Sequence, residues 1–126
     1  MSPARRALDT ITVTGIRATG FHGVFEHEKR EGQEFRVDLT LHTSTRAAAA
    51  SDDLRDTIDY GALSLAVVQE IQAGPYDLIE KLAGVIAERV LGEFSPHAVT
   101  VSVHKPQAPI PVPFDDVVLT IHRERA

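Results

Sequence analysis

The 126-residue sequence contains no cysteine and has no long apolar run. The lack of cysteine excludes disulfide bonds, thiol catalysis and zinc sites with cysteine ligands, and it fits a reducing compartment. No segment approaches the roughly 18 apolar residues of a membrane span, and residues 1–8 lack the apolar core of a signal peptide. We therefore expect a cytoplasmic protein that has no membrane partner.

Basic charge is also scarce. Thirteen basic residues stand against 18 acidic ones, which gives a net charge of −5. The basic residues are scattered and do not form a stripe with interleaved aromatic residues, so we expect no nucleic-acid partner. The length predicts a single domain over residues 1–126, large enough for a hydrophobic core without covalent staples.

Four segments have the alternating pattern of β-strands. They cover residues 11–18, 35–42, 98–104 and 116–123. A phase break at Thr14-Gly15 predicts a β-bulge in the first strand. The polar, glycine-containing segment 20–34 predicts a long loop that joins the first two strands as an antiparallel pair.

Two helices are predicted between the second and third strands. The first has its apolar stripe over residues 63–71 and ends at Gly74-Pro75. The second follows Asp77 and Glu80, which resemble a capping box, and closes at Gly92. A shorter helical turn is expected over residues 47–50.

The order β-β-α-α-β-β predicts an α+β fold, a four-stranded antiparallel sheet with two helices on one face. The other face would be polar, with residues such as Asp38, His42 and His104. Because the sheet would have two free edges, we expect a closed oligomer, such as a barrel built from several chains.

Lys105 stands at the end of the third strand, in phase with Val99, Val101 and Val103. The alternation directs this amine toward the apolar side of the sheet. It is one of only three lysines, beside ten arginines, which makes its position notable. A lysine at a strand end also commonly extends to water, and position alone does not separate the two readings.

The loop over residues 22–33 is longer than a hairpin needs, and such loops are often functional. Its histidines and glutamates match no standard metal-ligand spacing, so we expect no metal. Glu28 in this loop is read either as a solvated charge or as a functional carboxylate.

Two residues at helix starts have open roles. Tyr60 follows a run of aspartates and would either cover a surface or reach into a cleft. Glu80 would either satisfy free amide groups of its helix or accept two hydrogen bonds from a guanidine-like ligand edge. One pair of carboxylate oxygens cannot do both.

Five motifs, taken together, resemble the dihydroneopterin aldolase family of folate biosynthesis. They are Gly20-Phe21-His22-Gly23 followed by Glu28, Gly32-Gln33-Glu34-Phe35, Asp56-Thr57-Ile58-Asp59-Tyr60, Leu78-Ile79-Glu80-Lys81-Leu82-Ala83 and Lys105-Pro106-Gln107-Ala108-Pro109-Ile110. The resemblance covers about residues 10–124, in order and without gaps. Residues 1–10 fall outside it and are expected to form a poorly ordered extension.

The resemblance implies the tunnelling fold, in which sheets join edge to edge into a tetrameric ring and two rings stack into an octamer. It implies a pterin substrate bound at the junction of two subunits. Glu80 would grip the 2-amino group and N3, with Ile79, Ile58 and Tyr60 as further binding residues. Lys105, Tyr60 and Glu28 would be the catalytic residues, and no cofactor or metal would be required.

The reaction implied is a retro-aldol that converts 7,8-dihydroneopterin into 6-hydroxymethyl-7,8-dihydropterin and glycolaldehyde without a Schiff base. Epimerisation at C2′ is expected as a side activity. The alternatives are an epimerase or oxygenase that uses the same residues, and a non-catalytic ring protein that retains the pterin pocket.

Overall fold

The computed structural model describes residues 8–126. The predicted N-terminal extension lies mostly outside the described residues, and Asp9 already begins the first strand. The elements in chain order are β1 (Asp9–Gly20), α2 (Glu26–Glu31), β2 (Gln33–Thr43), α3 (Arg46–Ser51), the 3-10 turn η1 (Leu54–Asp56), α4 (Tyr60–Gln72), α5 (Ile79–Phe94), β3 (Ala98–His104) and β4 (Val118–Glu124).

The four strands form one antiparallel sheet in the order β1-β2-β3-β4. The predicted bulge is confirmed, because the register between β1 and β2 shifts between Val13 and Ile16. Gly15 has a φ of 74° in this bulge, and its N–H donates to the Asp38 carboxylate at 2.8 Å. A side chain at this φ would be strained, which is why glycine fits here.

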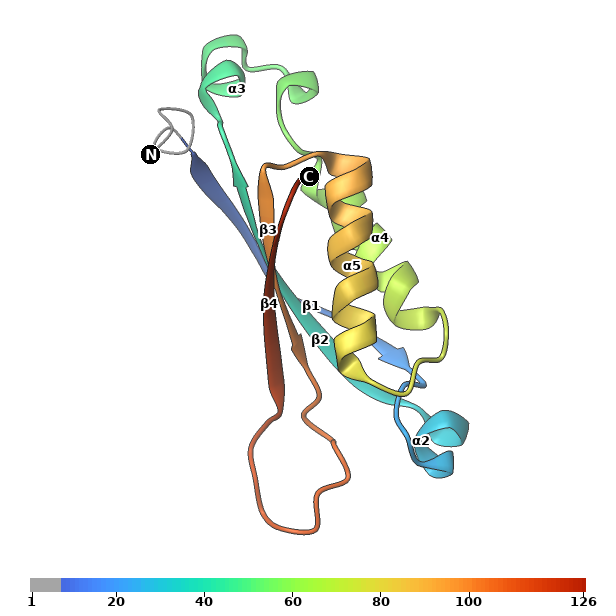
Figure 1. Cartoon of the computed structure of the whole chain (residues 1–126). Coiled ribbons are helices and arrows are strands. Elements are labelled where there is room, and N and C mark those ends of the chain that lie inside the picture. The colour runs from blue at the N-terminus through green and yellow to red at the C-terminus, as the bar shows by residue number, and fades with distance from the viewer. Residues whose placement is uncertain (1–7) are drawn as a thin grey trace.

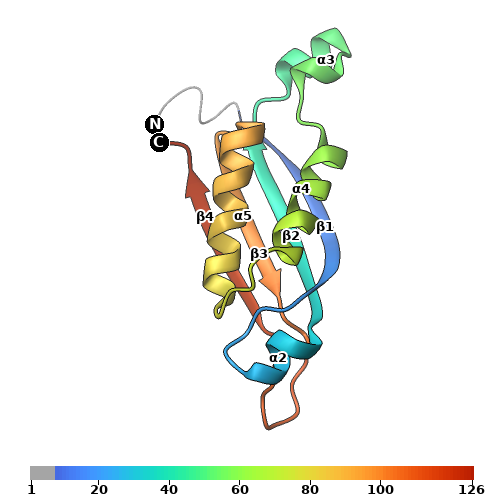
Figure 2. The same ribbon diagram turned by 90° about the vertical axis from the view of Figure 1, so that its right-hand side faces the viewer.

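Both long helices cover the same face of the sheet, as predicted (Figures 1 and 2). The α4 helix packs on β1, and α5 packs on β3 and β4. The core between the layers contains fully buried residues from β2, β3 and both helices, among them Phe35, Leu39, Leu63, Leu82 and Val101. Period-2 strands and 3.6-period helices thus direct their apolar stripes into one core.

The connection between β1 and β2 differs from the predicted loop. Both strands extend into it, and its centre forms the short helix α2. Acidic residues lie in the first turn of α2 and basic residues in the last, which suits the helix dipole, and Gly32 at φ 73° ends the helix. The polar composition that indicated a loop is that of a surface helix.

The predicted boundaries of α5 were wrong at both ends. Leu78, not Asp77, is the N-cap residue, and it makes no side-chain capping hydrogen bond, so Asp77 and Glu80 do not form a capping box. The helix continues past Gly92 to Phe94 and ends at Ser95, which has a φ of 54°. Leu91 and Phe94 pack against the core, and this contact extends the helix through the glycine.

The opposite sheet face is polar, as expected, and is joined by hydrogen bonds across the strands. Thr100 contacts His42 at 3.2 Å and His122 at 2.9 Å, and Ser102 contacts Thr120 at 2.8 Å. No helix covers this face in either view (Figures 1 and 2). Among the described residues, no helix is long and apolar enough to cross a bilayer.

Candidate active site

A cavity of about 300 Å³ opens at one end of the sheet. Its walls come from the β1–β2 connection, the start of α5 and the β3–β4 connection, which lie together in both views (Figures 1 and 2). Eight of its twelve lining residues are apolar, and the four charged ones are Glu28, Asp77, Glu80 and Lys105. An apolar pocket with a few converging charges is the usual form of a small-molecule site.

Lys105 and Glu28 form an ion pair at the inner end of this cavity. The Nζ of Lys105 lies 2.7 Å from Oε2 of Glu28, and the two side chains are only 13% and 3% exposed. Lys105 therefore does not extend to water, and Glu28 is not a solvated loop charge. The backbone N–H of Lys105 donates to the Val117 carbonyl at 2.8 Å, which fixes the lysine between β3 and β4.

The Glu28 carboxylate has two more donors. The Phe25 N–H donates to Oε1 at 3.2 Å, and the side-chain amide of Gln33 donates to Oε2 at 2.9 Å. Burial opposes the ionisation of Glu28, but hydrogen bonds from Lys105, Gln33 and Phe25 together hold its pKa below its ordinary value. The site therefore maintains Glu28 as a carboxylate.

The wall beside this carboxylate is the backbone of Gly23. Its φ of 151° is one that side chains rarely adopt, and a Cβ at this position would overlap with the Glu28 carboxylate. Lys29 holds the same segment in place, because its Nζ donates to the Gly23 carbonyl at 2.6 Å and to Asp77 at 2.5 Å. The β1–β2 connection is thereby fastened to the residues that precede α5.

Glu80 is a further charged residue that lines the cavity. It lies in the first turn of α5, and its side chain makes no hydrogen bond or ion pair with any described residue. The capping role considered for it is therefore wrong, and its oxygens are free to accept hydrogen bonds. Ile79, which was expected to bind substrate, lines the same cavity.

His22 does not act as a ligand for metal or substrate. Its ring is fully buried, with Nε2 2.7 Å from the Ile71 carbonyl and Nδ1 accepting from the Tyr76 N–H at 2.9 Å. Burial lowers the pKa of His22, and the nearby charge of Lys105 acts in the same direction against the Ile71 hydrogen bond. This neutral ring ties the segment after β1 to α4 and to the α4–α5 connection, and so supports the cavity wall.

Tyr60 and Ile58 do not line this cavity within one chain. Tyr60 is the first residue of α4 and is 63% exposed, whereas Ile58 belongs to the core. The two long helices run in opposite directions, so the start of α4 and the start of α5 lie at opposite ends of the helical layer (Figures 1 and 2). Within one chain, the same cavity is therefore lined by Lys105, Glu28, Glu80 and Ile79, whereas Tyr60 lies away from it.

Sequence reasoning assigned no role to Gln33, although it contacts the Glu28 carboxylate. The signal was present, because Gln33 is in phase with Phe35 and Val37 on the buried face of β2. The same period-2 argument that singled out Lys105 would have singled out this amide.

The fold and the site together define an enzyme with a mostly apolar cavity that contains a lysine–carboxylate ion pair and a further carboxylate. Comparison with known proteins identifies it further. The family model for dihydroneopterin aldolase matches residues 11–122. The chain belongs to the dihydroneopterin aldolase family, whose members are carbon–carbon lyases of folate biosynthesis.

Relatives of similar length support this assignment. The chain is 47% identical over 118 residues to dihydroneopterin aldolase of Streptomyces coelicolor, covering 94% of this chain and 99% of the relative. It is 40% identical over 119 residues to the enzyme of Streptococcus pyogenes, covering 94% of this chain and all of the relative. The crystal structure of Escherichia coli dihydroneopterin aldolase in complex with neopterin superposes with a TM-score of 0.84 at 26% identity, covering 91% of this chain and 98% of that one.

Proposed function

We propose that this protein cleaves the C1′–C2′ bond of 7,8-dihydroneopterin and releases 6-hydroxymethyl-7,8-dihydropterin and glycolaldehyde. The observation that carries the proposal is the Lys105–Glu28 ion pair, which shares one cavity with a Glu80 carboxylate that has no partner in the described part of the chain. The related Escherichia coli enzyme was crystallised in complex with neopterin, which has the side chain of 7,8-dihydroneopterin on the oxidised form of the same ring. A cavity of about 300 Å³ suits a bicyclic ring.

Glu80 is proposed to hold the pterin ring. The 2-amino group and N3 of a pterin present two parallel N–H donors, and a carboxylate accepts such a pair in a bidentate manner. Glu80 has no competing partner among the described residues, and Ile79 next to it supplies apolar contact with the ring. This arrangement would orient the substrate side chain toward Lys105 and Glu28.

The proposed cleavage requires neither a metal nor a Schiff base. Breaking the C1′–C2′ bond leaves an electron pair at C1′, and the N5=C6 imine of the substrate is conjugated with that carbon and accepts the pair. Lys105, acting as the free amine through a water molecule, takes the proton of the 2′-hydroxyl and manages the proton at N5, with Glu28 orienting the lysine or the water. Tyr60 then supplies the proton that C1′ gains. Acid–base steps of this kind contribute roughly 10² to 10⁴ in rate.

A second subunit is proposed to supply Tyr60, because Tyr60 lies outside the cavity of its own chain. The free edges of β1 and β4 suit joining of sheets into a tetrameric ring, and two rings would stack into an octamer. Val24, Phe25 and Leu78 at the cavity are more than half exposed, which fits a site that a neighbour completes. Ile58 would act as a binding residue only in such an interface. The binding role of Ile58 and the cytoplasmic location of the protein stay predictions.

Epimerisation at C2′ is proposed as a side activity, because re-addition of the aldehyde through its other face uses the same groups.

The variant Lys105→Ala tests the proposed function. It is assayed with 7,8-dihydroneopterin for glycolaldehyde, for the C2′ epimer and for oxidised pterin. We expect turnover to be abolished, while the Kd for neopterin changes by less than about tenfold, or about 1.4 kcal/mol. Parental turnover in this variant would contradict the role of Lys105. If the unmutated protein binds pterin but does not turn it over, the protein is a non-catalytic ring protein.

A further inference from the structure

A second, smaller cavity of about 130 Å³ also borders Glu28. Its lining contains no large apolar side chain and consists of His27, Glu28, Glu31, Gly32, Gln33 and Gln107. Glu28 is the one residue that lines both this cavity and the larger one among the described residues. The side chains of His27 and Glu31 are exposed on α2 and form the solvent side of the cavity.

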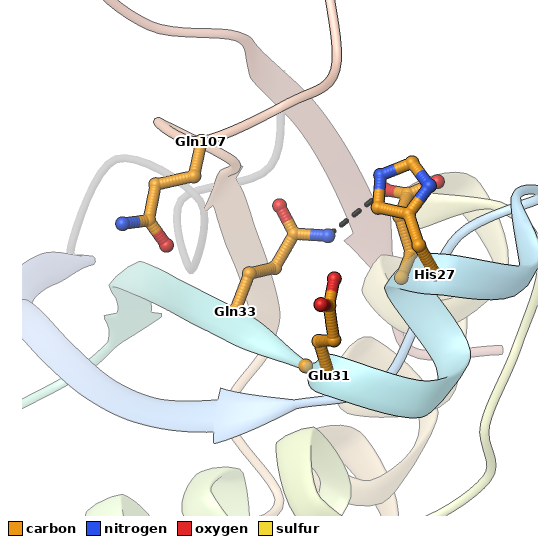
Figure 3. A pocket seen from close by; sticks show the side chains of 6 residues that line it. His27, Glu31, Gln33 and Gln107 are labelled. Carbon is orange, nitrogen blue, oxygen red and sulfur yellow. Dashed lines mark hydrogen bonds between the residues drawn. The ribbon is translucent and has the colours of Figure 1, made fainter.

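Gln33 presents an unpaired acceptor in this cavity. Gln33 is 9% exposed, and its Oε1 has no hydrogen-bond partner among the described residues. The amide orientation is fixed, because its nitrogen donates to the Glu28 carboxylate at 2.9 Å and points at the His22 carbonyl at 3.4 Å. Reversing the amide would place its oxygen against two acceptors. Figure 3 shows this amide between Gln107 and the α2 side chains His27 and Glu31.

We propose that this polar cavity is a water site that carries protons between the Lys105–Glu28 pair and bulk solvent, with Gln33 as its anchor. A buried acceptor in a polar cavity of this size is the usual setting of bound water, which would donate to Oε1 of Gln33. Water in the cavity would extend from Gln33, past the Glu28 carboxylate, to the exposed side chains of His27 and Glu31 on α2. Gln33 is then a positioning residue for Glu28 as well.

The need for such a route follows from the proton balance of the proposed function, on which this inference rests. Lys105 is an ammonium in the ion pair, so it must first release one proton to solvent. In the cleavage, the 2′-hydroxyl returns one proton to this amine, and C1′ receives one proton from Tyr60. The overall reaction neither consumes nor releases a proton, but each turnover requires the pair to give one proton to solvent and Tyr60 to regain one from it. A pterin held on Glu80 fills the larger cavity, and the smaller one is the remaining path to water.

Gln33→Met tests the inference, because methionine keeps the length of the side chain and removes the amide. In weak buffer we expect kcat to fall about fivefold or more while KM changes less than about twofold. Raising the concentration of an imidazole buffer at constant pH and ionic strength should restore kcat, because a small base replaces the blocked route. A loss that no buffer relieves, or an unchanged kcat, would overturn the proton route.

Glu31→Leu and Glu26→Leu form a matched pair on α2, since Glu31 lines the cavity and Glu26 does not. This pair decides the question if Gln33→Met does not fold. Glu31→Leu should lower kcat in a manner that imidazole relieves, whereas Glu26→Leu should behave as the parent. Parental kcat in Glu31→Leu would contradict the route. A parent that releases no glycolaldehyde would instead contradict the proposed function.

Discussion

The amine of Lys105 lies 2.7 Å from the carboxylate of Glu28, and the two side chains are only 13% and 3% exposed. An ion pair removed from water is costly unless each partner is well hydrogen-bonded, and Glu28 meets this condition with donors from Phe25 and Gln33. Such a pair adds little net stability compared with apolar residues. Its cost is understandable where charge is needed for chemistry, and the pair lies on the wall of the cavity that contains Glu80.

Glu80→Gln should weaken pterin binding without unfolding the protein. The amide keeps one acceptor but loses the charge, and charge-assisted hydrogen bonds contribute about 1.5–3 kcal/mol. We therefore expect the Kd for neopterin, measured by titration calorimetry, to rise roughly tenfold or more. Glu88→Gln on the exposed side of the same helix is the control and should bind as the parent does. Unchanged affinity in Glu80→Gln would refute the role of Glu80.

Mixing two inactive variants tests the shared site. Tyr60→Phe and Lys105→Ala should each have very low turnover. If Tyr60 comes from a neighbouring subunit, co-refolded mixtures contain sites with an intact lysine from one chain and an intact tyrosine from the other. Random mixing of equal amounts would restore about a quarter of the sites. No recovery in mixed oligomers, verified by light scattering, would mean that one chain supplies both groups.

Gly23→Ala should damage both the fold and the reaction. The added Cβ would overlap with the Glu28 carboxylate, and the φ of 151° is unfavourable for alanine. We expect a loss of roughly 1–3 kcal/mol in the free energy of unfolding by urea, together with reduced kcat. Gly84→Ala is the control, because a Cβ there meets no atom within 4 Å. Alanine in that helix position should be neutral or stabilising by about 0.5–1 kcal/mol.

His104 should make stability depend on pH above neutrality. Its Nδ1 lies 2.8 Å from Asp116 and its Nε2 lies 2.7 Å from Asp38, and a neutral imidazole has only one N–H for these two carboxylates. The Asp116 hydrogen bond raises the pKa of His104 most, burial acts against it, and Asp38 adds to the increase. The stabilisation is therefore complete below about 6.5, the ordinary value, and is lost as pH rises through the higher folded-state pKa.

Urea unfolding of the parent and of His104→Gln measures this effect. The stability difference between the two proteins should be larger at about pH 6 than at about pH 9. His122→Gln, on the same sheet face, serves as the control for loss of an imidazole that contacts Thr100. A difference between parent and His104→Gln that does not vary with pH would show that the contacts do not require the protonated ring.

The period-2 pattern of the strands correctly placed Lys105 and the valines before it, because alternation alone decides which face a strand residue takes. Composition was less reliable in the β1–β2 connection, where a polar helix was predicted as a loop. The capping box at Asp77 failed for a tertiary reason, since Asp77 forms an ion pair with Lys29 from a distant segment. A local sequence pattern gives no information about a partner that comes from a distant segment of the chain.

The sequence by itself determined the antiparallel sheet, the two covering helices, the bulge at Gly15 and the family, because these depend on periodicity, local backbone preference and motif order. Only the tertiary structure decided the state of the site residues. Glu28 became a buried, triply hydrogen-bonded carboxylate. Glu80 became a carboxylate without a partner among residues 8–126, and Gln33 became the partner that links Glu28 to a second cavity. The physical reason is that burial and hydrogen bonding arise between segments far apart in the chain, and they fix the charge and orientation on which the chemistry depends.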